Sequence, residues 1–312
     1  MAEPLLSVKG LRVDYEDITA VDDVSFSVEA GMVYGLIGPN GAGKTSIIRV
    51  IATLLQPTYG QVQVCGIDLV ADPLHALQHL GFMPDMPPLY EDLFVEEFLE
   101  LFASAYGLSG AARTKRIDSL LEKVQLVEKR RTPAGELSRG MKQRLFLAKT
   151  LLHDPKVLLL DEPASGLDPR ARLDMRDVIV ELGREGKAVV VSSHILAEME
   201  DFCNSVGIME RGKMLLSGRI GDILKQLRPG LLLRVRLLQP DDRLGAQLGG
   251  FAGVSDVEVD GSSATFKLAG EADAAANLLR ELIQSDFRVA EYREQTSNLQ
   301  DIFLQVSTGR VS

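Results

Sequence analysis

A glycine-rich segment near the N-terminus carries the strongest chemical signal in the sequence. Residues 38–45 fit the phosphate-loop pattern G-x-x-x-x-G-K-[ST]. Glycines let successive backbone N–H groups converge on phosphate oxygens, the lysine can reach the β- and γ-phosphates, and the threonine hydroxyl can ligate Mg²⁺. An ordinary glycine turn is the alternative. The predicted contacts are Gly38, Pro39, Asn40, Gly41, Ala42, Gly43, Lys44, Thr45 and Ser46.

Two adjacent carboxylates supply complementary chemistry. Asp161 and Glu162 directly follow the apolar run 157–160. We expect Asp161 to hold Mg²⁺ through water and Glu162 to polarise an attacking water. Acidic residues often end strands, so a structural role is equally open for this pair alone. Together with the phosphate loop, the pair predicts a site for phosphoryl transfer to water.

A third segment, residues 138–143, reads Ser-Arg-Gly-Met-Lys-Gln and precedes a helical stretch that runs to His153. Ser138 is a favoured N-cap residue. One interpretation is only the start of a helix. The other is an anion site, where the backbone N–H groups and the helix dipole at the N-terminus face a phosphate.

These residues need elements that position them. Strand-like alternation from Leu5 to about Glu29 indicates an antiparallel opening sheet. Short continuous apolar runs alternate with helical stretches, which favours a parallel α/β core covered on both faces. The apolar runs are 33–37, 157–160 and 188–191, and the helical stretches include 45–54 and 168–185.

Two further segments complete the predicted organisation. Residues 93–152 read as mostly helical and are predicted to be a helical insertion within a first domain, residues 1–227. Residues 228–312 form a second, α+β domain whose β-α-β-β-α-β order indicates a ferredoxin-like fold. Its predicted strands are 231–238, 254–259, 264–268 and 287–292, and its helices are 241–248 and 272–285, with a last helix at 299–306.

Composition excludes several classes of protein. The 312 residues, 46% of them hydrophobic, suit one large or two ordinary globular domains. The 34 Lys and Arg against 44 Asp and Glu give a net charge of −10, so no nucleic-acid partner is expected. We expect no signal peptide and find no apolar run near the ~20 residues of a membrane span. Two distant cysteines, without metal-ligand spacing, indicate a reducing, cytosolic compartment.

The order of the motifs resembles the ATP-binding subunit of an ATP-binding cassette (ABC) transporter, over roughly residues 5–227. The end of the chain resembles the accessory domain of the ABC-2 type, drug-export-like subfamily. The likeness implies a P-loop NTPase fold with a parallel core sheet, an antiparallel β subdomain and a helical insertion. The motifs that carry it are the phosphate loop, 137–143, 159–163, 165–169, Ser193-His194 and, for the tail, 297–304.

The resemblance implies further roles for single residues. Tyr15 matches the aromatic on which adenine stacks, with an edge-strand tyrosine as the alternative. His194 matches the switch histidine near the γ-phosphate, whereas a lone histidine would otherwise be a packing residue. Asp168 matches a carboxylate along the dimer interface, although it can simply cap the following helix. Ser138 and Gly140 are the expected contacts to the γ-phosphate.

Two departures from the family pattern affect these roles. Arg139 stands where a second glycine is usual, and Met141 where glutamine is common. Arg139 adds positive charge near a γ-phosphate or points to solvent. Asp85 stands where the family carries a glutamine that reaches Mg²⁺ and signals to the membrane partner. A carboxylate suits Mg²⁺ but is shorter and has no N–H donor, so we predict a metal role and leave sensing open.

An apolar stripe at helical spacing follows that segment. Most of it is interpreted as core of the helical insertion, with a minority exposed near residues 87–90 as a groove for a partner's coupling helix. The stripe comprises Leu93, Phe94, Phe98, Leu101, Phe102 and Tyr106.

We therefore predict a Mg²⁺-dependent ATPase subunit that powers a separately encoded membrane permease, for export, from the inner face of the cell membrane. The resemblance implies a head-to-tail homodimer, or a heterodimer with a related cassette, in which each ATP lies between one phosphate loop and the other copy's 138–143 segment. Lys44, Glu162 and His194 are the predicted catalytic residues.

Two alternative functions explain the sequence less well. A soluble ABC ATPase that acts on ribosomes or DNA typically carries two cassettes or long coiled-coil insertions, and neither is visible in this sequence. A P-loop kinase fails to explain residues 138–143 or His194.

Overall fold

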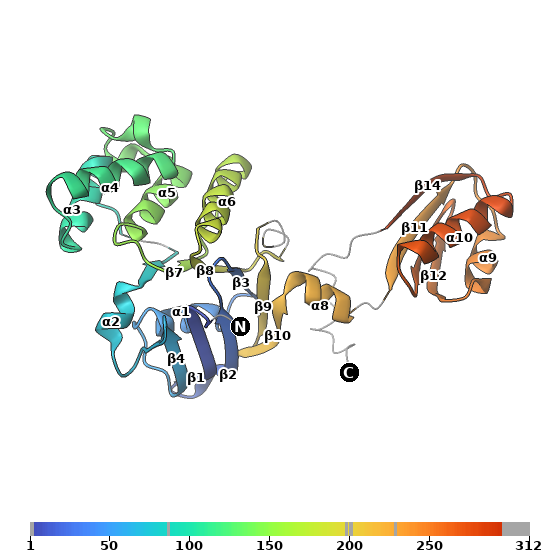
Figure 1. Cartoon of the computed structure of the whole chain (residues 1–312), viewed down its shortest axis with the longest axis horizontal. Helices are drawn as coiled ribbons and strands as arrows, with labels where there is room; N and C mark the ends of the chain where they lie inside the picture. The colour runs from blue at the N-terminus through green and yellow to red at the C-terminus, as the bar shows by residue number, and fades with distance from the viewer. Residues whose placement is uncertain (1–2, 86–87, 197–198, 200–201, 228–229, 295–312) are drawn as a thin grey trace. The chain divides into compact units, whose positions relative to one another are not determined.

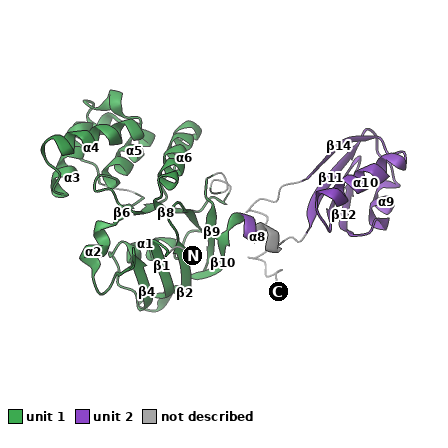
Figure 2. Cartoon of the chain, in the orientation of Figure 1, with its two compact units in different colours: residues 1–220 green, residues 221–312 purple. Residues whose placement is uncertain are grey.

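The computed structural model describes residues 3–85, 88–196, 199, 202–227 and 230–294, and Figure 1 draws their helices and strands. Two compact units, residues 1–220 and 221–312, are coloured separately in Figure 2. This division falls at the start of helix α8 (Ile220–Leu227), and the predicted boundary at the end of that helix stays a prediction. Within the described ranges, no helix is both long and apolar enough to cross a membrane.

A six-stranded sheet forms the centre of the first unit. Its order is β10-β9-β3-β8-β7-β6, and all neighbours are parallel except β10 and β9. Strands β3, β7 and β8 are buried along their whole length, which explains their continuous apolar sequences and confirms the predicted parallel core. The strands are β3 Val33–Ile37, β6 Leu80–Met83, β7 Val157–Asp161, β8 Ala188–Ser193, β9 Ser205–Glu210 and β10 Lys213–Arg219.

An antiparallel sheet packs against this centre, as expected. Its order is β2-β1-β4-β5. Alternate residues of β2 are buried, including Val24, Phe26 and Val28, so that one face of the sheet joins the core. The strands are β1 Leu6–Tyr15, β2 Ile18–Val28, β4 Tyr59–Val64 and β5 Ile67–Asp68.

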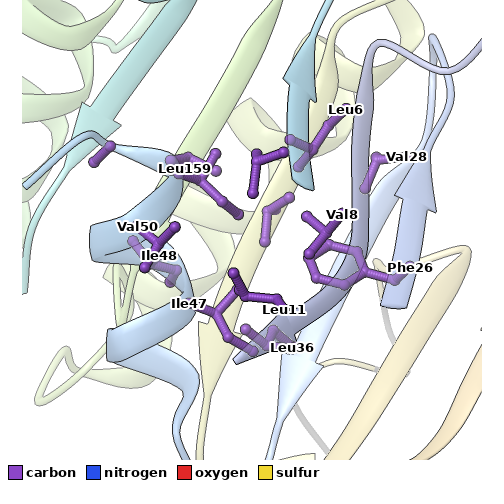
Figure 3. Close-up of a cluster of buried hydrophobic side chains, with 14 of the residues drawn as sticks. Leu6, Val8, Leu11, Phe26, Val28, Leu36, Ile47, Ile48, Val50 and Leu159 are labelled. Atoms are coloured by element: carbon purple, nitrogen blue, oxygen red, sulfur yellow. The ribbon is translucent and has the colours of Figure 1, made fainter. Parts of the chain in front are cut away.

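Helix α1 (Lys44–Ile51) lies in the same hydrophobic cluster. Figure 3 shows Leu11 of β1, Leu36 of β3 and Ile47 of α1 close together in it. The predicted helix was longer, to residue 54. It ends earlier because Thr53 adopts a left-handed conformation with φ of 59°, which an α-helix does not accommodate.

The segment between β6 and β7 is helical, as predicted. Figure 1 shows α3, α4 and α5 grouped together, and contacts join all three pairs. One isolated bridge, between Phe94 and Pro133, adds a β-type contact that the sequence did not indicate. Besides α1, the described helices of the first unit are α2 Pro73–Gln78, α3 Val95–Ala105, α4 Gly110–Lys123, α5 Arg139–Thr150 and α6 Pro169–Arg184, with short 3₁₀ turns at Val127–Lys129 and Ala134–Glu136.

The second unit has the predicted β-α-β-β-α-β order. Its antiparallel sheet runs β12-β13-β11-β14, the ferredoxin-like arrangement, and its core lies between the sheet and two helices. The predicted helix at 299–306 lies outside the described residues. The elements are β11 Leu231–Leu237, α9 Leu244–Gly250, β12 Val254–Asp260, β13 Ser263–Leu268, α10 Ala272–Gln284 and β14 Val289–Glu294.

His153 gives the first unit a pH-dependent contribution to stability. Its Nε2 lies 3.0 Å from the carbonyl oxygen of Leu80, and its ring stacks on Tyr106 with centroids 4.3 Å apart. Burial lowers the pKa of His153. In the unfolded chain the His153 imidazole takes up a proton near its ordinary pKa of about 6.5, whereas in the folded chain it does so only at lower pH. The contribution of His153 to folding stability is therefore complete above that pH and is lost as the pH falls below it.

We therefore expect the urea midpoint to fall between pH 7.5 and pH 5.5, and to fall less in His153→Gln. Glutamine keeps a side-chain hydrogen-bond donor but does not titrate in this range. An equal fall in both proteins would show that other groups carry the pH dependence.

Candidate functional site

The phosphate loop connects β3 to α1 and depends on its glycines for two reasons. Gly43 has a φ of 102°, a conformation that side chains disfavour. A Cβ at Gly43 would lie 2.4 Å from the carbonyl oxygen of Ala20, and one at Gly38 would lie 2.4 Å from that of Met209. In addition, no side chain of the described residues caps the N-terminus of α1, which leaves its first N–H groups available to an anion.

A cavity of about 430 Å³ opens at this loop. It joins the loop, both predicted carboxylates, His194 and Asp85 in one place, and its size suits a nucleotide-sized ligand. Its lining residues are Ala20, Asn40, Gly41, Ala42, Gly43, Lys44, Thr45, Ser46, Asp85, Asp161, Glu162, Ser165 and His194.

Sequence analysis missed two of these lining residues as site residues. Ala20 reaches the cavity because β2 passes beside the loop, and no local sequence signal marks it. Ser165 lies in the 165–169 motif, in which only Asp168 was assigned a role.

Lys44 is the buried cation of the cavity. Its side chain is 7% exposed, and its Nζ donates to the carbonyl oxygens of Gly38 at 2.7 Å and Pro39 at 3.2 Å. Burial lowers the pKa of Lys44, and the nearby carboxylates of Glu162 and Asp161 oppose that shift. A phosphate in the cavity would compensate the ammonium charge more fully than these neutral carbonyls do.

Asp161 and Glu162 are held by one residue of the neighbouring strand. Asp161, 5% exposed, accepts a hydrogen bond of 2.5 Å from the Ser192 hydroxyl. The Ser192 Oγ in turn accepts a hydrogen bond of 2.9 Å from the Glu162 N–H. Glu162 has a φ of 49°, a left-handed conformation uncommon outside glycine. Sequence analysis assigned no role to Ser192, because its bridging role requires the pairing of β7 with β8.

His194 contacts the Glu162 carboxylate rather than the hydrophobic core. Its Nδ1 lies 2.9 Å and 3.1 Å from the two carboxylate oxygens, and its side chain is 42% exposed. Oε1 of the same carboxylate is 4.0 Å from the Lys44 Nζ. Glu162 therefore sits between two nitrogen groups at the cavity wall, where a water molecule can give up a proton to it.

The oxygen-bearing residues predicted to bind Mg²⁺ line the same cavity. Thr45, Asp161 and Asp85 offer a hydroxyl and two carboxylates, which are ligands suited to this ion. Over the part of the chain described, no cluster of three His, Cys, Asp or Glu side chains forms a metal cage. This small donor set fits Mg²⁺, which keeps several waters and usually shares its coordination with substrate phosphates.

Tyr15 lies near the cavity without lining it. It is the last residue of β1, and its hydroxyl is 3.3 Å from the Ser46 Oγ. Tyr15 pairs with Ile18 of β2 and lies beyond Arg12, where the pairing of β1 with β4 ends. Gly38 and Pro39 also stay outside the lining, where their carbonyl oxygens bind Lys44.

The other predicted contacts, Ser138, Gly140 and Asp168, do not line the cavity in the described structure. Ser138 caps α5, since its Oγ accepts from the Met141 N–H at 3.3 Å, which confirms the N-cap prediction. Asp168 caps α6 by accepting from two backbone N–H groups at 3.0 Å each. One chain thus brings together only part of the predicted site.

The interpretation of the apolar stripe as mostly core is wrong. Only Phe98 is fully buried, whereas Phe94, Leu101 and Tyr106 are exposed and Leu93 and Phe102 are half-buried. The reason lies in the orientation of α3, whose buried residues are Val95, Phe98, Leu99 and Ala103. Half of the stripe is therefore exposed, and the other half is buried or half-buried.

Comparisons with known proteins agree with this arrangement. The ABC transporter family profile matches residues 21–165, and the family of the ATP-binding protein DrrA1-3-like, C-terminal domain matches residues 218–307. The uncharacterized ABC transporter ATP-binding protein YhcH of Bacillus subtilis (strain 168) is 35% identical over 306 residues, which are 97% of this chain and 96% of that protein.

Two further similar proteins each match a little over 70% of the chain. The Nod factor export ATP-binding protein I of Ralstonia nicotianae is 37% identical over 221 residues, which are 71% of this chain and 69% of that protein. A solved structure of the ATP-binding subunit of an ABC transporter is 35% identical, with a TM-score of 0.65, over 72% of this chain and 93% of that one. The chain belongs to the ATP-binding proteins of ABC transporters, which hydrolyse ATP to power transport.

Proposed function

We propose that this chain hydrolyses Mg²⁺-ATP in the cavity at the phosphate loop and powers export through a separately encoded permease, at the cytoplasmic face of the membrane. The observation that carries the proposal is that one cavity joins Lys44, Asp161, Glu162 and His194. The export role is supported by the name of the Ralstonia relative and by the DrrA-like second unit. The relatives described above are named for transport, so nothing in them favours an ATPase of ribosomes or DNA.

Each residue of the cavity has a task in this proposal. Lys44 and the N–H groups at the start of α1 bind the phosphates and stabilise charge as the γ-phosphoryl group leaves. Glu162 accepts the proton of the attacking water, and His194 holds its carboxylate in place. Thr45, Asp161 and Asp85 would hold Mg²⁺, which neutralises charge on the phosphates.

Head-to-tail dimerisation would complete the site. Ser138, Gly140 and Asp168 lie outside the cavity, and Ser138 and Asp168 are exposed. We propose that they face the nucleotide of a second copy, or of a related cassette, where the N-terminus of α5 contributes N–H groups to the γ-phosphate. Tyr15, beside Ser46, is proposed to stack on adenine.

The exposed stripe of α3 is the proposed docking surface for the permease. Phe94, Leu101 and Tyr106 are each at least 40% exposed, and Tyr90, whose ring lies near those of Phe98 and Phe102, is 54% exposed. A coupling helix of the permease would bury these apolar groups.

Reconstitution tests this function directly. The membrane protein that co-purifies with the chain is incorporated with it into vesicles, and we expect Mg²⁺-ATP hydrolysis that the membrane protein stimulates. Phe94→Asp with Leu101→Asp should keep basal hydrolysis and lose the stimulation. Co-purification with ribosomes or DNA in place of a membrane protein would contradict the proposal.

Asp85 provides a separate test of the metal site. Asp85→Ala should raise the Mg²⁺ concentration needed for half-maximal hydrolysis by about tenfold, because losing a metal-supporting group lowers metal affinity by about that factor in other sites. Asp85→Gln keeps a side-chain oxygen and should retain most activity, with equal or stronger stimulation by the permease. The measurement is ATPase rate against Mg²⁺ concentration, with and without permease. If Asp85→Ala matches the wild type in both, Asp85 is only a loop carboxylate.

A further inference from the structure

The N-terminus of α5 packs tightly against the loop 163–168 and the first turn of α6. A Cβ built on Gly140 would lie 2.6 Å from the Cβ of Ala171. A Cβ built on Gly166 would lie 2.3 Å from Nη1, 2.4 Å from Cζ and 2.7 Å from Nη2 of Arg139. The Arg139 guanidinium therefore occupies the space that a side chain at position 166 would fill.

Gly166 suits this contact through its backbone as well as its size. Its φ of 65° lies in the left-handed region, and the absence of a Cβ leaves its surface open to the guanidinium. Arg139 forms no hydrogen bond or ion pair with any described residue. The contact is thus packing of a cationic group against backbone and not a salt bridge.

The same loop leads directly to the cavity. The Ser165 N–H donates to the Glu162 carbonyl oxygen at 3.0 Å, and Ser165 lines the cavity itself. Gly166 follows Ser165, and Asp168 ends the loop as the cap of α6. One short turn therefore connects Gly166 to the backbone of Glu162.

We propose that Arg139 is a positioning residue that fixes the loop 163–168 to the N-terminus of α5. This inference rests on the proposed function, in which Ser138 and Asp168 face the nucleotide of a second copy. Held together by Arg139, these two residues approach that copy as one rigid unit, and the turn at Glu162 keeps its hydrolytic geometry. Arg139 does not line the cavity, so it contributes to turnover and not to the first binding of ATP.

A double-mutant cycle tests the contact. In the wild-type background Gly166→Ala must displace the guanidinium as well as accept the positive φ, whereas in Arg139→Gly only the φ remains unfavourable. We expect Gly166→Ala to lower kcat about tenfold in the first background and about twofold in the second, because residues in contact are non-additive. Equal fold-changes in both backgrounds would overturn the contact.

Three substitutions at position 139 test how the contact acts. Arg139→Gly should lower kcat about fivefold and change KM for ATP less than about twofold, the pattern of an interaction that matters after substrate binding. Arg139→Gln keeps a planar group and should retain more activity than Arg139→Lys, which keeps only the charge. If Arg139→Lys keeps full activity while Arg139→Gln loses activity, Arg139 acts as a cation for the phosphate bound to the second copy, and the positioning role is overturned.

Controls separate this inference from the proposed function. Arg184→Gly makes the same change at an exposed arginine near the end of α6 and should keep wild-type kcat, and the melting temperature of each variant confirms that it folds. If Lys44→Ala abolishes hydrolysis while Arg139→Gly keeps wild-type kcat, only the positioning role is wrong. If Lys44→Ala keeps turnover, the proposed function itself fails.

Discussion

Lys44→Ala is expected to abolish measurable ATP hydrolysis and to weaken ATP binding. Lys44 is the buried ammonium of the cavity, and among the described residues only neutral carbonyls lie within hydrogen-bond distance of its Nζ. Removing one preorganised group that stabilises transition-state charge costs about 10²–10³ in kcat, and the lost attraction to the phosphates adds to that effect. The measurement is the steady-state ATPase rate with titration of a fluorescent ATP analogue.

Lys149→Ala is the matched control for this variant. Lys149 is a half-buried lysine of α5 whose ammonium lies 4.8 Å from the ring centroid of Phe102, away from the cavity. Its pKa, like that of Lys44, is lowered by burial. We expect it to affect stability and not ATP affinity. Unchanged turnover in Lys44→Ala would contradict the assignment of the phosphate loop.

Glu162→Gln is expected to separate ATP binding from hydrolysis. Glutamine has nearly the shape of glutamate and can keep a contact to His194, but it lacks the charge that accepts a proton from water. General-base contributions are about 10²–10⁴-fold, so hydrolysis should fall by about that factor while ATP and Mg²⁺ still bind. Because hydrolysis reopens the proposed dimer, this variant should accumulate as an ATP-bound dimer.

The test of Glu162→Gln combines ATPase rates with size-exclusion chromatography in the presence and absence of Mg²⁺-ATP. Glu181→Gln serves as the control, because Glu181 is an exposed carboxylate of α6 that pairs with Lys123 outside the cavity. It should behave as the wild type. Near-normal turnover in Glu162→Gln would remove Glu162 from catalysis. Slow turnover without an ATP-dependent dimer, even with the permease present, would count against the head-to-tail arrangement.

The sequence alone determined most of the local chemistry. The phosphate loop needs glycines, a lysine and a hydroxyl at fixed spacing, so a contiguous motif predicts it. Strands β3, β7 and β8 are buried on both faces, which makes them continuous apolar runs that read as parallel strands. The ferredoxin-like order of the second unit follows from the same periodicity, since alternation and helical spacing depend on local geometry.

Tertiary structure decided which distant groups meet. Ser192 joins Asp161 to Glu162 only because β8 pairs with β7, and Arg139 covers Gly166 only because α5 packs on the loop before α6. The orientation of α3 exposes Phe94 and Leu101, although an apolar stripe on a helix normally marks a core face. Periodicity reports which residues share a face, but the neighbour of that face depends on contacts between residues far apart in the chain. Those contacts set the partners of Glu162 and leave Ser138 and Asp168 outside the cavity of their own chain.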